Sequence, residues 1–458
     1  MKEYDIIIVG GGIGGLMTAK RLIEGESTPS IAIFEQGSAL ETRKCPIVEG
    51  KAEKCIHCKT CDIMSGIAGA GAFSDGKFNI TTEYGGWLQE YIGHQKALDY
   101  QYQVYDILKP LDDKHKVYAP NDKLKAEAIK HDLHMLQGEV VHFGTDGNLR
   151  IMTKLVDILR EKVDIHTRTK VEDIDMAAKT IVAGGESYRY RKLVLAVGRV
   201  GSSWLAQFCR ANNIALSNSQ VDIGVRVELP RVIWEDISRQ IYEPKIVYRT
   251  KTYGDRTRMF CFNSGGEVVM ENSNGILTVN GHANSDEALK TKNSNFAILS
   301  TQNFTEPFNQ PIAYAKQIAG LANMISGGSV IVQRFGDLVE GRRTNAHRLA
   351  QSTTIPTLNA TPGDLSLCMP KRQLDNIIET IYALDKIAPG TANRDTLLYG
   401  AECKYYSARP KFINDRFEIA EDIYCIGDGA SVTRSLSQAG AQGLYVADMI
   451  VNSNLRGS

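Results

Sequence analysis

The sequence predicts an α/β fold in which a parallel sheet with helices is interrupted by a second region of mixed sheet and helices. Three observations lead to this prediction. Near the N-terminus, an isoleucine-rich run, residues 5–9, leads into a glycine-rich turn and a helical pattern. Residues 422–451 repeat the order of strand, glycine turn and helix. Between them, from about residue 216, an alternation typical of half-buried strands replaces the helical pattern.

The composition excludes several classes of protein. Of the 458 residues, 43% are hydrophobic, which is typical of a globular chain and not of a disordered or fibrous one. Lys+Arg and Asp+Glu both number 53, and this zero net charge argues against a nucleic-acid partner. The apolar run 6–9 is too short for a signal peptide, and no stretch approaches the length of a membrane helix. We therefore expect a cytoplasmic protein without a membrane partner, in which thiols stay reduced.

The first glycine-rich turn has the pattern of a dinucleotide-binding site. Gly10, Gly12 and Gly15 form G-x-G-x-x-G between the strand 5–9 and a helix. Gly10 permits the tight turn, Gly12 lets a pyrophosphate approach the backbone, and Gly15 allows the helix to pack on the strand. The helix N-terminus provides N–H groups and a partial positive charge for the phosphates. A second strand ends at Glu35, 20 positions after Gly15, where a carboxylate accepts from a ribose and disfavours a 2′-phosphate.

Three further segments favour FAD over NAD as the dinucleotide. Residues 422–430 form a predicted strand ending in Gly-Asp-Gly, and with the helix that follows they resemble the second flavin motif of flavoproteins with two dinucleotide folds. The run 191–198 resembles the apolar strand ending in Ala-x-Gly of the same proteins, and 163–171 resembles their strand that ends near the adenine. No second G-x-G-x-x-G follows a strand in 200–400, so we expect no separate NAD(P)H domain. Electrons would then come from NAD(P)H that visits the flavin transiently, or from an electron-donor protein.

The loop 63–79 is rich in small residues, which let the backbone pass close to a large planar ligand. Phe73 indicates that the loop packs against the protein. In related flavoproteins the chain crosses the flavin face at this point, so Ser74, Asp75 and Lys77 are candidates for contacts with flavin or substrate, and Lys77 is a catalytic candidate. The residues predicted to bind FAD are Gly10, Gly12, Gly14, Gly15, Glu35, Gln36, Gly71, Ser74, Asp75, Gly76, Val171, Ala196, Gly198, Gly427, Asp428, Gln438 and Ala439.

Four of the nine cysteines lie in a short stretch before this loop. Cys55, Cys58 and Cys61 form C-x-x-C-x-x-C, and Cys45, ten positions before Cys55, precedes a proline. This spacing is similar to iron–sulfur ligation in bacterial-type ferredoxins and favours a [4Fe–4S] cluster. Zinc, a redox-active dithiol and four unligated thiols are the alternatives. A cluster at this position would lie near enough to the flavin loop to exchange electrons with the flavin.

The cysteine stretch and the loop together resemble a known family. The run GIAGAGAFSDGKFN, preceded by CIHCKTCDIMS, resembles uncharacterised FAD-dependent dehydrogenases of bacteria and archaea. The resemblance implies a glutathione-reductase-like, Rossmann-type FAD domain interrupted by a substrate domain. Where the family tends to show two glycines in the flavin loop, this chain has Ile67-Ala68-Gly69. Further matching segments, which extend the resemblance to nearly the whole chain, are 221–228, 295–297, 304–307, 336–338, 362–364 and 424–429.

These patterns divide the chain into three segments. They are the FAD-binding domain at 1–215 with a helical excursion at about 85–147, the substrate domain at 216–394, and the return to the FAD-binding domain at 395–458. In the returning segment, strand alternation places Glu402 and Lys404 on one face, where they are candidates for a catalytic acid–base pair. A solvated ion pair is the alternative interpretation.

The predicted function is an FAD-dependent oxidoreductase that transfers a hydride between flavin N5 and a small organic substrate. A cluster held by the four cysteines would relay electrons. The alternatives are an FAD-dependent monooxygenase, a flavin-dependent RNA-modifying protein and a cysteine-based redox sensor. The zero net charge argues against the RNA-modifying protein, and the cysteines argue against the monooxygenase.

Overall fold

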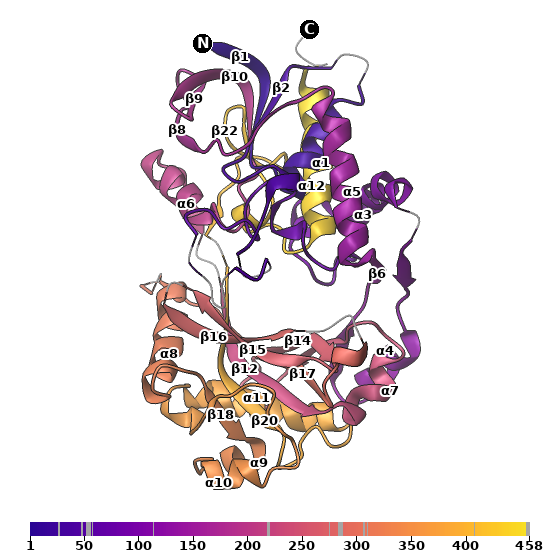
Figure 1. Ribbon diagram of the computed structural model, residues 1–458, viewed down its shortest axis with the longest axis vertical. Helices are drawn as coiled ribbons and strands as arrows, with labels where there is room; N and C mark the ends of the chain where they lie inside the picture. Colours follow the sequence, from indigo (N-terminus) through magenta and orange to yellow (C-terminus); the bar gives the residue numbers. More distant parts are fainter. Residues whose placement is uncertain are drawn as a thin grey trace. The chain divides into compact units, whose positions relative to one another are not determined.

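The chain forms two compact units, which are described separately and drawn in Figure 1. In this computed structural model the first unit comprises Met1–Tyr118, Gly138–Ser217 and Ser407–Ser458, and the second comprises Ala119–Gln137 and Asn218–Tyr406. The residues that the structure describes are 1–25, 28–46, 49–51, 56, 58–112, 114–217, 220–273, 275–282, 287–305, 307–308, 310–406 and 408–454.

The first unit is built on a largely parallel sheet. Its strand order is β22-β23-β10-β1-β2-β7, with β8 and β9 paired at the side of β10. These strands are β1 (Lys2–Val9), β2 (Ile31–Phe34), β7 (Asp164–His166), β8 (Val171–Asp175), β9 (Thr180–Ala183), β10 (Glu186–Leu195), β22 (Glu418–Ala420) and β23 (Ile423–Cys425). Strand β1 pairs in parallel with both β2 and β10, as expected where helices cover the connections.

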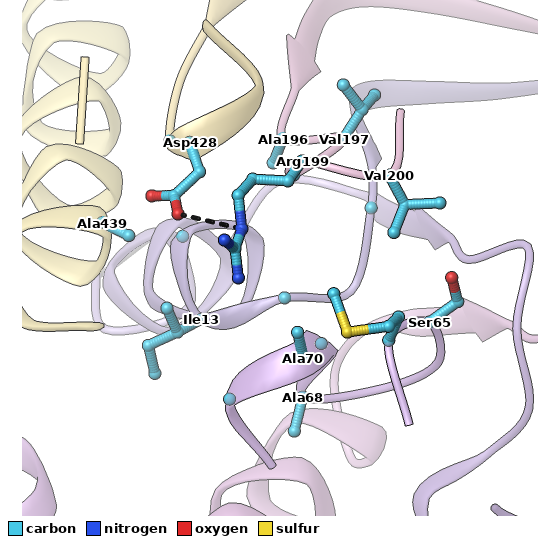
Figure 2. A pocket seen from close by; sticks show the side chains of 18 of the residues that line it. Ile13, Ser65, Ala68, Ala70, Ala196, Val197, Arg199, Val200, Asp428 and Ala439 are labelled. Carbon is cyan, nitrogen blue, oxygen red and sulfur yellow. Dashed lines mark ion pairs between the residues drawn. The ribbon is translucent and has the colours of Figure 1, made fainter. Parts of the chain in front are cut away.

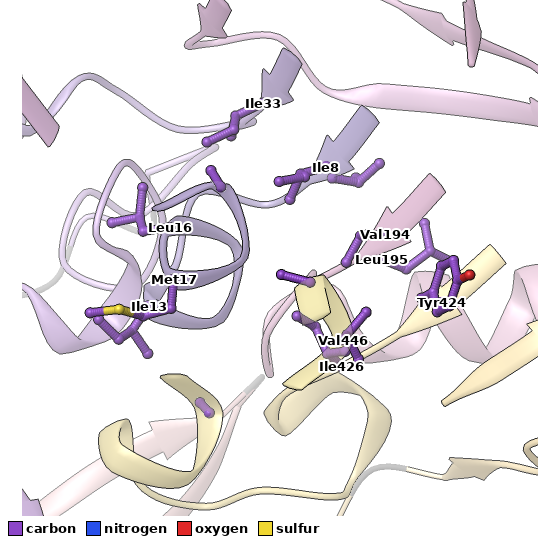
Figure 3. Packing of buried hydrophobic residues seen from close by; sticks show 14 of the residues in the cluster. Ile8, Ile13, Leu16, Met17, Ile33, Val194, Leu195, Tyr424, Ile426 and Val446 are labelled. Carbon is purple, nitrogen blue, oxygen red and sulfur yellow. The ribbon is translucent and has the colours of Figure 1, made fainter. Parts of the chain in front are cut away.

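Helices α1 (Ile13–Leu22) and α12 (Leu436–Asn454) lie side by side against this sheet (Figure 1). Two glycines make the close approach possible, since a Cβ on Gly443 would lie 2.3 Å from the carbonyl oxygen of Gly14. Figure 3 shows the core below them, where Ile8, Leu16 and Val194 are fully buried. The predicted α/β fold is confirmed, because the isoleucine-rich run, the glycine turn and the C-terminal strand and helix assemble as one layered unit.

The remaining elements of the first unit are short or peripheral. They are the helices α2 (Leu88–Ile92), α3 (His94–Leu108), α5 (Gly144–Arg160) and α6 (Ser202–Ala211), and the strands β3 (Lys77–Ile80), β4 (Lys116–Tyr118), β6 (Glu139–His142), β11 (Leu216–Ser217) and β21 (Arg409–Pro410). Within the described residues of either unit, no helix combines the length and the apolar character that crossing a bilayer requires.

The second unit contains an eight-stranded sheet in the order β19-β18-β20-β12-β17-β14-β13-β5. The strands are β5 (Leu133–Leu136), β12 (Val221–Pro230), β13 (Lys245–Arg249), β14 (Arg256–Ser264), β17 (Asn293–Gln302), β18 (Ile331–Arg334), β19 (Thr361–Pro362) and β20 (Leu397–Tyr405). A separate hairpin joins β15 (Glu267–Ser273) to β16 (Ile276–His282). The helices are α4 (Asp122–Ile129), α7 (Glu235–Ser238), α8 (Pro311–Ile325), α9 (Phe335–Val339), α10 (Ala346–Ala350) and α11 (Lys371–Asp385).

The two faces of this sheet differ in character. Val225 and Val227 of β12 pack into one apolar core with Ala319 of α8 and Ile377 of α11. Because side chains alternate along a strand, Arg226 between them points to the other face. That face carries buried charged groups, and the β15–β16 hairpin packs there.

Two segments lie in a different unit from the one that the sequence-based division gave. Residues 119–137 belong to the second unit, because β5 pairs with β13 through Leu133 and Tyr248. Residues 395–406 also belong to it, because β20 lies between β12 and β18. Each segment contains a strand whose partner strands are distant in the sequence. Local alternation of side chains does not reveal such pairing.

Candidate cofactor site

A cavity in the first unit is formed by chain segments that are far apart in the sequence (Figure 2). The turn between β1 and α1 forms one side, and the loop after Met64 forms another. The ends of β10 and β23 and the start of α12 complete the wall. This is the edge of the sheet at which parallel strands end, where dinucleotides bind in folds of this type.

The glycines at this cavity have two distinct roles. A Cβ on Gly10 would lie 2.3 Å from the carbonyl oxygen of Ala196, and one on Gly15 would lie 2.2 Å from that of Gly10, so both residues serve packing. At Gly12 the nearest atom to a Cβ would be 3.9 Å away, and at Gly427 no atom lies within 4 Å. A side chain at these two positions would fill the cavity, which leaves the backbone exposed to a bound ligand.

Glu35 ties the second strand to two loops at the cavity. Its side chain is buried, and its carboxylate accepts from the N–H groups of Gly11 at 2.9 Å, Gly37 at 2.8 Å and Gly66 at 3.0 Å. It lines this cavity and also an adjoining smaller one, whose wall includes Val171 and Trp204. A carboxylate at the junction of the two cavities has the position to accept hydrogen bonds from a ribose.

Asp428 brings a titratable group to the far side of the cavity. Burial raises the pKa of its carboxyl, and the guanidinium groups of Arg434 and Arg199 together with a hydrogen bond from Thr433 act against this. Thr433 Oγ1 donates to the carboxylate at 2.8 Å. Arg199 Nε lies 3.9 Å from the other carboxylate oxygen, and Figure 2 marks this ion pair with a dashed line. The group therefore gains a proton more readily than an exposed aspartate.

The small-residue loop is held in shape by Arg43. This side chain is buried, and its guanidinium donates four hydrogen bonds to backbone carbonyls of the loop and its base. The acceptors are Asp62 at 2.7 Å, Ile63 at 2.9 Å, Ile67 at 2.8 Å and Gly69 at 2.8 Å. From the other side, Asn148 of α5 donates to the carbonyl of Gly71 at 2.7 Å. Sequence reasoning missed both residues, because neither stands in a motif.

Most of the residues predicted to bind FAD lie at these cavities. The main cavity is lined by Gly10, Gly12, Gly14, Glu35, Gln36, Gly71, Ser74, Ala196, Gly198, Gly427, Asp428 and Ala439, and Val171 lines the adjoining one. Met64 and Ser65 in the wall belong to the predicted loop 63–79, whereas sequence reasoning did not name Arg199, Val200, Trp204 and Arg434. Arg199 and Val200 directly follow the Ala-x-Gly motif, so extending that motif would have found them.

Four predicted residues do not line either cavity. Gly15 packs α1 on β1, as described above. Gln438 donates its side-chain amide to the carbonyls of Thr81 at 3.3 Å and Tyr84 at 3.1 Å, so it anchors the chain after β3. The other two, Asp75 and Gly76, follow the lining part of the loop.

The catalytic candidate Lys77 lies at the start of β3, beside other titratable groups. Its Nζ is 3.8 Å from a carboxylate oxygen of Asp75, and Nε2 of His142 is 3.7 Å from the same oxygen. Burial lowers the pKa of His142, although Asp75 acts to raise it. Lys77 does not line the cavity, so the structure places it beside the FAD loop and not in the cavity wall.

The other two catalytic candidates, Glu402 and Lys404, lie on β20 of the second unit. Lys404 Nζ is 3.1 Å from Glu402 Oε1, and Arg226 Nη1 is 3.6 Å from Glu402 Oε2. Glu402 is 0% exposed, whereas the side chain of Lys404 is 29% exposed, so only one member of the pair reaches solvent. Burial acts to lower the pKa of Lys404, but Glu402, Glu271 and Cys261 together more than offset this and the pKa is raised. Lys404 is therefore a cation and a hydrogen-bond donor at neutral pH.

The predicted metal ligands are only partly within the described residues. Cys45 is half-buried, Cys58 and Cys61 are exposed, and all three are free thiols. Cys55 lies outside the described residues. Among the residues that the structure does describe, no three His, Cys, Asp or Glu side chains are grouped so that they could hold a metal ion.

Two family models match separate parts of the chain. Residues 4–208 match the family described as pyridine nucleotide-disulphide oxidoreductase, and residues 220–405 match the family described as FAD-dependent protein, C-terminal domain-like. This protein is an FAD-dependent oxidoreductase. The cavity fits the cofactor, because its glycine-lined wall leaves backbone open to a ligand at Gly12 and Gly427. No curated protein matches the chain.

Several solved structures are similar to this oxidoreductase over nearly its whole length. Glycine oxidase from Geobacillus kaustophilus has 12% identity and a TM-score of 0.38, with 99% of this chain and 95% of that chain covered. L-proline dehydrogenase from P. horikoshii has 11% identity and a TM-score of 0.40, with coverages of 99% and 94%. PqsL from P. aeruginosa has 12% identity and a TM-score of 0.39, with coverages of 100% and 88%. Structural similarity at TM-scores this low does not indicate function.

Proposed function

We propose that the protein is a dehydrogenase or reductase that transfers a hydride between flavin N5 and a small organic substrate. The observation that supports this most directly is the cavity in which the turn after β1, the small-residue loop and the ends of β10 and β23 converge. When bound, FAD supplies a two-electron acceptor and donor at N5. We further propose that the chain acts in the cytoplasm, as one of the uncharacterised bacterial and archaeal FAD-dependent dehydrogenases that it resembles.

The chain's own residues have separable roles in this proposal. The N-terminus of α1, which begins at Ile13, stabilises the pyrophosphate through its N–H groups and partial positive charge. Glu35 accepts from the ribose, and Asp428 contacts the ribityl chain or the pyrophosphate. Arg43 and Asn148 keep the loop between them in one shape, so that less ordering is required when the cofactor binds.

We propose that the four-cysteine loop ligates a [4Fe–4S] cluster that relays electrons. The support is the C-x-x-C-x-x-C spacing and the free state of the three described thiols, Cys45, Cys58 and Cys61. A set of four thiolates also suits zinc, which would give the loop a structural role. The proposed electron partner is a donor protein, or NAD(P)H that binds transiently.

The test of this function begins with the purified holoprotein. We expect flavin absorption, stoichiometric FAD on denaturation, and reversible bleaching of the flavin bands when dithionite is added without oxygen. A folded chain that neither carries FAD nor takes it up from solution would overturn the proposal. Reduction by NADH or NADPH, measured in the same cell, separates a nicotinamide donor from a protein donor.

A further inference from the structure

The second unit contains a buried polar cluster on the sheet face opposite α8 and α11. Its members are Arg226 on β12, Cys261 on β14, Asn295 on β17, and Glu402 and Lys404 on β20. Arg226, Asn295 and Glu402 each have an exposed fraction of 0%. Such a group of polar side chains requires partners, because burying them without hydrogen bonds costs free energy.

Several atoms of the cluster lack these partners. Arg226 Nε and Nη2 donate to Asn295 Oδ1 at 2.9 Å and 2.7 Å, and Nη2 also donates to the carbonyl of Cys261 at 2.7 Å. The 3.6 Å between Arg226 Nη1 and Glu402 Oε2 is too long for a hydrogen bond. Within the described residues, no hydrogen-bond partner reaches Arg226 Nη1, Asn295 Nδ2 or Glu402 Oε2, whereas Glu402 Oε1 lies 3.1 Å from Lys404 Nζ. Two donors and one acceptor of the cluster are therefore unused.

The charges of the cluster do not balance. Arg226 and Lys404 are cations, and Glu402 is the one anion among the five side chains, which leaves one net positive charge. Glu271 also raises the pKa of Lys404 through its negative charge. Its side chain is exposed, however, and water screens such an interaction. Arg226 is fully buried, but the side chain of Lys404 is 29% exposed, so water screens part of this excess charge. A ligand with one negative charge would neutralise it.

The backbone is irregular on both sides of the cluster. The register of β12 against β20 shifts between Gly224 and Arg226, and that of β14 against β17 shifts between Phe260 and Asn263. Within the second irregularity, Cys261 adopts a φ of 55°, which is unfavourable for a residue with a side chain. Bulges and strained residues of this kind gather at functional sites, where they re-aim side chains.

The β15–β16 hairpin covers the cluster. A Cβ on Gly281 of β16 would lie 1.8 Å from Arg226 Nη2, so the backbone of this strand rests directly on the guanidinium. The hairpin forms its own two-stranded sheet and is not hydrogen-bonded into the ladder of the large sheet. Side chains hold the hairpin in place, since the Val268 N–H donates to Thr357 Oγ1 at 2.9 Å and the Leu277 N–H donates to Asn323 Oδ1 at 2.9 Å, so uncovering the cluster would break these contacts and not that ladder.

We propose that this cluster binds a small organic acid that carries a hydroxyl or amine group next to its carboxylate. Arg226 Nη1 and Asn295 Nδ2 donate to the carboxylate, and Glu402 accepts from the neighbouring hydroxyl or amine. The inference goes beyond the proposed function, because it assigns a ligand to the second unit by itself. In a hydroxy acid the carboxylate also supplies the missing negative charge, whereas an amino acid brings a compensating ammonium group.

Calorimetric titration of the wild-type holoprotein with four matched probes tests the proposal. The probes are L-lactate, L-alanine, propionate and isopropylamine, which share a three-carbon skeleton. We expect the three carboxylates to bind at millimolar concentrations and isopropylamine not to bind. We also expect lactate or alanine to bind more tightly than propionate, and whichever is tighter identifies the donor group. Binding of isopropylamine as tight as that of the acids, or no binding of any acid, would overturn the proposal.

Three variants locate the binding at the cluster. Arg226→Met is expected to weaken carboxylate binding at least about tenfold, as loss of a charged hydrogen bond implies. Glu402→Gln is expected to weaken the binding of lactate or alanine and to leave the binding of propionate nearly unchanged. Arg231→Met is the control, because Arg231 pairs with Glu287 near the surface of the same unit. If Arg226→Met bound propionate as the wild type does, the site would lie elsewhere.

The outcome is independent of cofactor binding. FAD content is measured by absorbance on every sample before titration. A sample without FAD that still discriminates acids from the amine would contradict the proposed function and leave the cluster as an acid-binding site. A sample that carries FAD but binds no acid would contradict only the proposal that the cluster binds an organic acid.

Discussion

The guanidinium carbon of Arg43 lies 4.7 Å from the centre of the Phe73 ring. The same side chain donates to the carbonyls of Ile67 and Gly69, so one residue contacts both the start and the later part of the loop. A cation over an aromatic face is attracted by the ring, and burial strengthens the attraction. Arg43 thus fixes a loop of small residues that has few side chains of its own to pack.

Arg43→Met is expected to raise the dissociation constant of FAD at least about tenfold, because the loop loses four hydrogen bonds from a charged donor. Arg43→Lys keeps the charge but not the planar fork, so it should recover part of the affinity. Quenching of flavin fluorescence measures both. Lys44→Ala is the matched control, since the side chain of Lys44 is exposed. Equal FAD affinity in Arg43→Met and wild type would contradict this role.

Gly12→Val should abolish FAD binding while the fold is retained. A Cβ at this position meets no atom closer than 3.9 Å in the protein, so the new side chain would occupy the cavity and strain little else. The measurement is FAD content together with circular dichroism. Gly320→Ala in α8 is the control, because a Cβ there contacts nothing within 4 Å. It should keep FAD and stabilise the helix by about 0.5–1 kcal/mol.

The stability of the apoprotein should depend on pH through Asp428. Burial raises the pKa of this carboxyl in the folded state, so the folded chain binds its proton more tightly than the unfolded chain. Stability from this group is therefore fully present below the unfolded value of 3.8 and is lost as pH rises through the folded pKa. Asp428→Asn removes this dependence.

Urea unfolding of wild type and Asp428→Asn, from about pH 4 to about pH 8, measures the effect. The stability advantage of the variant should grow as pH rises. If the difference in unfolding free energy between the two proteins stays constant over this range, or shrinks towards pH 8, the pKa of the Asp428 carboxyl is not raised in the folded state.

Metal content distinguishes the possible roles of the four-cysteine loop. If the loop holds a [4Fe–4S] cluster, protein purified without oxygen should contain about four irons and four sulfides per chain. It should also show a broad absorption band at about 400 nm. Cys58→Ser and Cys61→Ser should each lose this absorption. Cys425→Ala is the control, because that thiol is fully buried in β23. One zinc per chain, or no metal, would rule out the cluster.

The local parts of the cofactor site were readable from the sequence. Gly10, Gly12 and Glu35 belong to one continuous run of strand, turn, helix and strand, in which each contact joins residues close in the chain. The geometry of such a unit follows from backbone sterics and from the packing of one helix on two strands. The predicted FAD cofactor and α/β fold follow from this unit and from its C-terminal counterpart.

Contacts between distant segments could be learned only from the tertiary structure. No motif predicts that Arg43 fixes the loop, since its side chain binds backbone carbonyls and any residue type provides those. Arg226 and Glu402 face each other because β12 and β20 are neighbours in the sheet, although 176 positions separate them. Strand pairing over such a distance depends on the whole sheet, so the buried charge and the unused hydrogen-bonding atoms became visible only when the second unit was folded.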